Sequence, residues 1–237
     1  MISFTTIKLM ASIFTPEFTI GDKLSLINFF KERSNNKFDG DFFSVPIPQD
    51  APAEIPRIIL NSEDNSWKLE ISLQRTNLIF LKSNLLEIED PDALNFSKFA
   101  QELFYSYKTD TDVKIQRLAY ITERASAIED NSPSQYIADK YCKDKYLEEP
   151  FNNAKQFELH SLKKYHFEGF NINSWVRLKS ANLLDEQKTP IIQIINDINT
   201  LSVQEDPEAN FTADNLSGYL DKIPGHLESI LDLYFKE

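Results

Sequence analysis

The chain has 237 residues, is 41% hydrophobic and contains only 5 glycines and 11 prolines, which excludes a fibrous or low-complexity protein. Its formal net charge of -12 disfavours binding to nucleic-acid phosphates and to anionic membrane surfaces, because both depend on lysine and arginine. Cys142 is the single cysteine, so an intrachain disulfide and the usual zinc motifs are excluded. A core built from this length needs neither disulfides nor metal ions.

The sequence predicts a cytoplasmic protein that does not enter a membrane. Residues 1–14 lack a basic segment and a small-residue cleavage site, and no window reaches the roughly 18 apolar residues of a membrane helix. The most basic stretch, 160–166, holds two lysines and two histidines and is more typical of a strand end or turn than of a nucleic-acid site. The acidity favours solubility and a basic partner protein.

The first elements predicted in chain order are a strand at 4–14 and a helix that follows Asp22, a suitable N-cap. We expect the inner face of this helix to consist of Leu24, Leu26, Ile27, Phe29 and Phe30. Residues 37–56, with four prolines from Pro46 to Pro56, then predict a long extended connector, because proline cannot donate to a strand ladder.

Short strands separated by polar turns follow the connector and predict an antiparallel meander. They lie at 57–62, 67–74 and 78–82, with 85–89 as a further strand or a continuation. Residues 67–74 alternate between apolar and polar, which is typical of a sheet with one buried side. The helix predicted after them carries an apolar stripe that should dock on the sheet, formed by Phe96, Phe99, Ala100, Leu103, Phe104 and Tyr107.

Residues 113–125 read as a strand with apolar side chains on both faces, which predicts a central position in a sheet. A helix introduced by Ser132 and Pro133 comes next, since serine suits the cap and proline the first turn. Three further strands are expected at 156–170, 174–184 and 189–203, the first with a bend left open.

The last helix of the chain keeps its apolar spacing from Leu216 to Tyr234 across Pro224 and Gly225. It is either one kinked helix or two short helices.

The order strand, helix, three strands, helix occurs twice along the chain, in residues 1–110 and 111–237. Order and length alone suggest an α+β fold built from two such pseudo-repeats, as antiparallel sheet with helices packed on one face. We expect a single domain, 1–237, in which the two copies fuse into one curved sheet of about eight strands. The alternative is two separately packed halves.

Several landmarks resemble a sporadically distributed, functionally uncharacterised bacterial family of about this length. They are RLAYITER at 117–124, the proline-rich approach to RIIL at 57–60, WKLEISLQRTNLIF at 67–80 and LDKIPGHLESILDLYF at 220–235. The resemblance implies a fold plan and a bacterial setting associated with mobile elements. It implies no reaction.

No catalytic motif supports an enzyme, because glycine-rich phosphate loops and nucleophile motifs are absent and the three histidines are scattered. We therefore predict no catalytic residue, no cofactor and no metal ligand. The sequence favours a non-catalytic protein-interaction or adaptor module, with a basic partner and a bacterial accessory or defence-type role, and a homo-oligomer stays open. The alternatives are a small-ligand domain with a pocket between sheet and helices, and an enzyme of unrecognised chemistry.

The charged strand at 117–124 is the candidate contact surface. One hypothesis places Arg117, Tyr120 and Arg124 in contact with the partner. The competing interpretation makes Arg117 and Glu123 a structural ion pair and Tyr120 an anchor for a helix, because charges at strand ends are usually solvated or paired.

Overall fold

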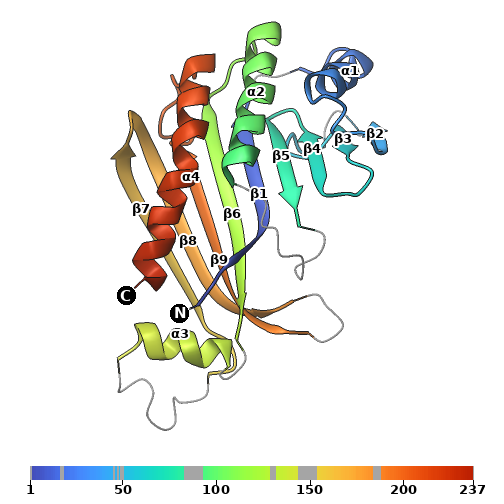
Figure 1. Ribbon diagram of the computed structural model, residues 1–237. Coiled ribbons are helices and arrows are strands. Elements are labelled where there is room, and N and C mark those ends of the chain that lie inside the picture. Colours follow the sequence, from blue (N-terminus) through green and yellow to red (C-terminus); the bar gives the residue numbers. More distant parts are fainter. Residues whose placement is uncertain are drawn as a thin grey trace.

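The fold is a single antiparallel sheet with helices on one face, shown in the computed structural model of Figure 1. The structure describes residues 2–16, 19–44, 46, 48, 51–82, 93–128, 132–143, 154–183 and 188–236. The strands within them are β1 (Thr5–Phe14), β2 (Phe42–Ser44), β3 (Ile58–Asn61), β4 (Trp67–Ile71), β5 (Arg75–Leu81), β6 (Arg117–Ala127), β7 (Glu158–Phe167), β8 (Phe170–Asn182) and β9 (Pro190–Thr200). The helices are α1 (Lys23–Arg33), α2 (Ala93–Thr111), α3 (Pro133–Tyr141) and α4 (Ala213–Phe235).

The described strands run in the order β2-β3-β4-β5-β1-β6-β9-β8-β7, so β1 and β6 lie side by side in the middle. Every neighbouring pair is antiparallel. The predicted α+β class and the predicted continuous sheet are confirmed. The central position expected for the strand at 113–125 is also confirmed, because β6 pairs with β1 on one side and with β9 on the other.

The hydrophobic core lies between the sheet and the helices. Alternate strand residues such as Leu9, Tyr120 and Ile198 point into it, and α2 and α4 run side by side over the middle strands (Figure 1). Tyr120 donates a hydrogen bond to the Ala93 carbonyl at 3.2 Å, and Tyr219 donates one to the Ile198 carbonyl at 2.7 Å. These bonds satisfy two buried hydroxyl groups and fix both long helices to the strands beneath them.

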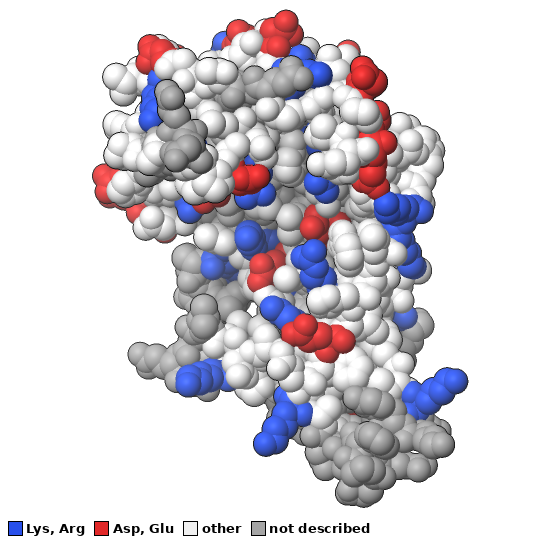
Figure 2. Space-filling view, turned by 180° about the vertical axis from the view of Figure 1, so that it is seen from behind, with Lys and Arg blue, Asp and Glu red and all other residues white. Residues whose placement is uncertain are grey.

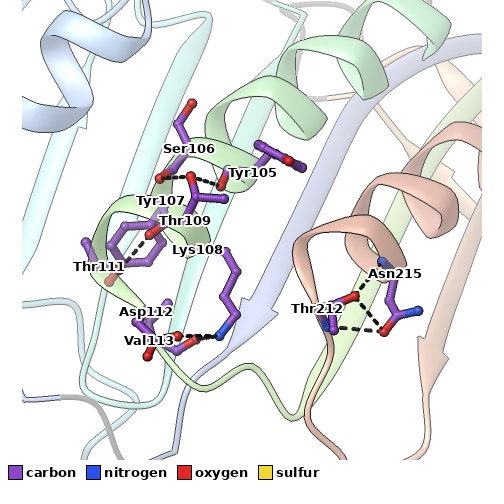
Figure 3. Close-up of polar contacts among 10 residues, drawn as sticks. All are labelled: Tyr105, Ser106, Tyr107, Lys108, Thr109, Thr111, Asp112, Val113, Thr212 and Asn215. Carbon is purple, nitrogen blue, oxygen red and sulfur yellow. Dashed lines mark hydrogen bonds and ion pairs between the residues drawn. The ribbon is translucent and has the colours of Figure 1, made fainter.

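The helix ends follow from local sequence. Asp22 accepts hydrogen bonds from the backbone of Leu24 and Ser25, as predicted for an N-cap, and Ser132 caps α3 in the same way. At the start of α4, Thr212 and Asn215 bond reciprocally in a capping box (Figure 3). The α4 helix continues through Pro224, which settles the question that the sequence left open in favour of one helix.

Three predictions in the first half need correction. Leu24 is 63% exposed, because it lies in the first turn of α1, whereas Ile27 and Phe30, three residues apart, form the buried face. The predicted proline-rich connector contains β2, an exposed strand at its start. The chain turns at 72–75 rather than at 75–77, where the sequence predicted the turn, since the Ser72 N–H bonds to the Arg75 carbonyl at 2.9 Å and β5 begins at Arg75. The strand considered at 85–89 lies outside the described residues.

In the second half, the stretch 156–170 forms a hairpin corner rather than one bent strand. Glu168 and Gly169 have φ of 49° and 92°, the left-handed values that a tight two-residue hairpin turn requires. The turn places β8 directly beside β7, from Phe167 opposite Phe170 onwards. His160 and His166 both lie before the turn and therefore share one face of β7.

Among the described helices, none is both long enough and apolar enough to cross a membrane.

Candidate functional site: the helix-free face of the sheet

The side of the sheet opposite the core is the candidate site. No described helix covers it, and we call it the helix-free face. Figure 2 shows it from behind, with acidic and basic side chains interspersed over its centre. Because side chains alternate along a strand, the residues between the core positions of each strand belong to this face.

A polar row crosses the helix-free face from strand to strand. In the sheet register it consists of Glu70, Asn77, Ser12, Ala119, Asn199, Asn173 and Lys164. The Ser12 hydroxyl donates to Asn77 at 2.8 Å, and the Asn77 amide donates to Glu70 at 3.4 Å. These bonds satisfy side chains that are almost fully shielded from solvent.

At the other end of the polar row, Glu205 connects the loop after β9 with two strands. Its carboxylate accepts from Lys164 at 2.5 Å and from Asn173 at 3.1 Å, and the Lys164 bond contributes most to lowering the pKa of Glu205 to about 2. The Asn173 side-chain oxygen, by contrast, is buried and has no hydrogen-bond partner among the described residues. This oxygen can therefore still accept a hydrogen bond.

Asp197 is the acid at the centre of this face. Burial raises the pKa of Asp197 above its ordinary value, while the hydrogen bond from Asn199 at 2.5 Å and the charges of Arg177 and Arg117 oppose the rise. The nearest oxygen of Asp197 lies 3.9 Å from Nη2 of Arg177. A carboxylate flanked by two arginines and an amide is typical of a structural network and orients the cations around it.

One accessible part of the helix-free face lies on β8 and β7. The Arg177 guanidinium lies 5.5 Å from the centre of the Trp175 ring, a cation–π arrangement. Leu162, opposite Trp175, is 41% exposed, and His160 and Lys164 flank it along β7. We call these five residues the contact patch. They offer an aromatic ring, an apolar side chain and hydrogen-bond donors to a partner.

The three residues predicted to share a contact surface lie on two faces. Arg117 lies on the helix-free face, with its guanidinium 5.0 Å from the Phe14 ring. Tyr120 is fully buried beneath α2, and Arg124, only 3% exposed, forms an ion pair with Glu228 of α4. The structure therefore brings Tyr120 and Arg124 together on the core side and leaves Arg117 near Asp197.

The competing structural interpretation of this strand holds for Tyr120 but not for the ion pair between Arg117 and Glu123. Tyr120 does anchor a helix, through its bond to Ala93 at the start of α2. In the described structure Arg117 and Glu123 form no ion pair, because six residues separate them along β6. Glu123 instead accepts a hydrogen bond from the Gln193 amide.

Sequence reasoning missed Asp197, Asn173 and the Trp175–Arg177 pair. The sequence does show that these β8 residues share one face, because Asn173, Trp175 and Arg177 occupy alternate positions of the strand. Their position beside Arg117 depends on the register of β8, β9 and β6, which joins residues far apart in the chain. No pattern within a single strand contains that register.

Comparisons of the sequence with models of protein families and with curated proteins find no match. Among the described residues, no group of three or more His, Cys, Asp or Glu side chains is arranged to hold a metal ion.

Proposed function

We propose that the protein is a non-catalytic protein-interaction module that binds a partner protein on the helix-free face. The supporting observation is the stacked Trp175–Arg177 pair beside exposed Leu162. Tryptophan and arginine are the residue types most enriched among those that dominate binding energy, and a central apolar contact excludes water around them. Arg117 lies at the margin of this surface, whereas Tyr120 and Arg124 support it from the core.

The net charge of -12 supports a basic partner, because long-range attraction accelerates the encounter of oppositely charged proteins. The helix-free face itself carries both signs, for example Arg177 beside Asp197. Contact there would therefore rest on complementary pairs, while the acidic remainder of the surface would steer the approach.

The test begins with affinity capture from an extract of the source organism, followed by purification of the captured protein and calorimetric measurement of its Kd. Trp175→Ala and Arg177→Ala should each weaken binding about tenfold or more, as expected for central interface residues. Arg33→Ala is the matched control, because Arg33 is an exposed arginine of α1 paired with Asp110 at 2.6 Å. It should leave Kd unchanged.

Unchanged affinity in both contact-patch variants, with melting temperatures equal to that of the wild type, would rule out this surface. Recovery of no partner by wild-type protein would also count against the proposal. Tyr120→Phe separates the contribution of β6 to stability from its proposed contribution to binding. It should lower stability by about 1 kcal/mol through the lost bond to Ala93 and leave binding intact.

We also propose that the fold consists of two related halves, 1–110 and 111–237. The support is topological: outward from the central pair the order is β1-β5-β4-β3-β2 on one side and β6-β9-β8-β7 on the other, so the halves correspond apart from the short additional edge strand β2. In each half the first strand pairs with the last, and the long helix follows that last strand. The bacterial accessory or defence-type setting rests on the family resemblance, and neighbouring genes would test it.

A small-ligand domain is the second candidate. A pocket of about 490 Å³ lies at the turn between β3 and β4, where Lys37 sits 4.3 Å from the centre of the Trp67 ring and Asp39, Glu63 and Asp64 form part of the wall. This volume falls within the range of ligand sites. A thermal-shift screen of metabolites tests whether this pocket binds a ligand, since a ligand of the folded state raises Tm. Trp67→Ala should abolish the rise in Tm.

A further inference from the structure

The outer strand β7 presents a long, regular edge. Its ten residues pair with β8 in unbroken register from Glu158 opposite Lys179 to Phe167 opposite Phe170. Among the described residues no strand pairs with its other side. Proteins usually shield such an edge with proline, a bulge, a very short strand or charged side chains such as lysine, of which β7 has Lys163 and Lys164. The opposite edge follows this rule, because β2 has only three residues, but β7 has neither proline nor a bulge.

A pocket lies beside this edge on the core side, between β7, β8 and the second half of α4. Its volume is about 270 Å³, just below the range of sites for drug-sized molecules, so it suits one or two side chains better than a free ligand. Its walls are formed by Ser161, Lys163, Tyr165, Ser174, Val176, His226, Ile230, Leu233 and Tyr234.

The walls of this pocket combine apolar surface with few polar groups. Leu233 is 75% exposed, so a side chain that entered the pocket would bury apolar surface against it. The Tyr165 hydroxyl and His226 Nε2 are 2.5 Å apart, and burial lowers the pKa of His226, which favours the neutral ring. An apolar side chain can therefore enter without displacing a charge from this part of the wall.

The β7 edge and the pocket lie so close together that one extended segment can contact both. A strand added beside β7 would lie about 4.8 Å away, and its side chains would meet those directly opposite on the same face. Lys163 and Tyr165 point to the pocket side. A residue opposite either of them would direct its side chain toward Leu233.

The charge of β7 specifies the partner. In a chain of net charge -12, this strand carries two lysines, Lys163 and Lys164, against one acid, Glu158. Lys164 is already paired with Glu205 at 2.5 Å, so Lys163 is the main cation that β7 offers to a partner. Lys163 is exposed at the mouth of the pocket. An acidic segment that pairs with β7 would therefore gain attraction from Lys163.

We propose that the β7 edge binds an extended acidic segment of a partner protein as a tenth strand, with an apolar side chain of that segment in the pocket between β7 and α4. Backbone hydrogen bonds would supply affinity, and the pocket and Lys163 would supply specificity. The pocket lies on the core side of the sheet, on the face opposite Trp175 and Arg177, although His160, Leu162 and Lys164 of the contact patch also belong to β7. Arg177→Ala therefore separates the two proposals.

The experiment selects binders from a phage-displayed library of random peptides on the purified full chain, and then measures synthetic copies by fluorescence anisotropy. Selection should enrich alternating acidic and apolar residues. Lys163→Glu and Leu233→Asp should each weaken binding about tenfold or more. The backbone N–H groups of a bound strand point alternately toward β7 and away from it. N-methylation of the amides that point toward β7 should therefore abolish binding, and N-methylation of the intervening amides should not.

Matched controls are Lys98→Glu on α2 and Leu24→Asp on α1, both exposed positions that should bind as the wild type does. Arg177→Ala should also retain the peptide, which separates this site from the contact patch. Enrichment of basic peptides, of no peptides, or of peptides that bind all variants equally would overturn the proposal. A dimer in light scattering that Leu233→Asp dissociates would overturn it too, since a second copy would then occupy the edge.

Discussion

At the scale of single residues, the least satisfied part of the core lies between Thr122 and Asn196, which face each other across β6 and β9. Both residues are fully buried, and neither the Thr122 hydroxyl nor the Asn196 amide has a hydrogen-bond partner in the described structure. A buried polar group without a partner costs free energy that an apolar group of the same shape avoids. We therefore expect Thr122→Val to raise the free energy of unfolding by about 1 kcal/mol, measured by urea denaturation.

Thr200→Val is the matched control for this prediction. Thr200 is equally buried on the same side of the sheet, but its hydroxyl accepts a hydrogen bond from the Leu118 N–H at 2.9 Å. Thr200→Val should lower the free energy of unfolding by about 1 kcal/mol, because it leaves the buried Leu118 N–H without a hydrogen-bond acceptor. If both variants were destabilised equally, Thr122 would have a partner such as an ordered water.

At the scale of elements, the start of α4 depends on its capping box. Thr212 accepts from the Asn215 N–H at 3.1 Å, and the Asn215 side chain accepts from the Thr212 N–H at 3.2 Å (Figure 3). Thr212→Ala should lower the free energy of unfolding by about 1 kcal/mol, and Thr212→Ser should restore it. Thr109→Ala should change it by roughly 0.5 kcal/mol or less, because the exposed Thr109 hydroxyl bonds only within α2, to the carbonyls of Tyr105 and Ser106 and to the neighbouring Asp110 carboxylate. Equal losses at both sites would contradict a specific role of the cap.

The elements themselves were largely predictable, because their signals are local. Asp22 and Ser132 each precede a helix with side chains suited to the cap, and the alternation in β4 gives its buried face directly. The candidate site was far less predictable. Arg117 was found as a charged residue in an apolar strand, but its neighbour Asp197 lies eighty residues away along the chain and reaches it only through the β6–β9 register. Tyr120 and Arg124 could be assigned to the core only once the helices were placed over β6.

At the scale of the whole molecule, the two halves share one sheet and one core, and we expect them to unfold together. β1 pairs with β6 along its length, and α2 contacts α4 across the same boundary. The two tryptophans report the halves separately, since Trp67 lies in β4 against Phe96 and Phe99 of α2, whereas Trp175 lies in β8. In each single-tryptophan variant, Trp175→Phe and Trp67→Phe, urea unfolding followed by fluorescence should coincide with unfolding followed by far-UV circular dichroism. A fluorescence midpoint that departs from the dichroism midpoint in either variant would mean that the halves fold independently despite their shared strands.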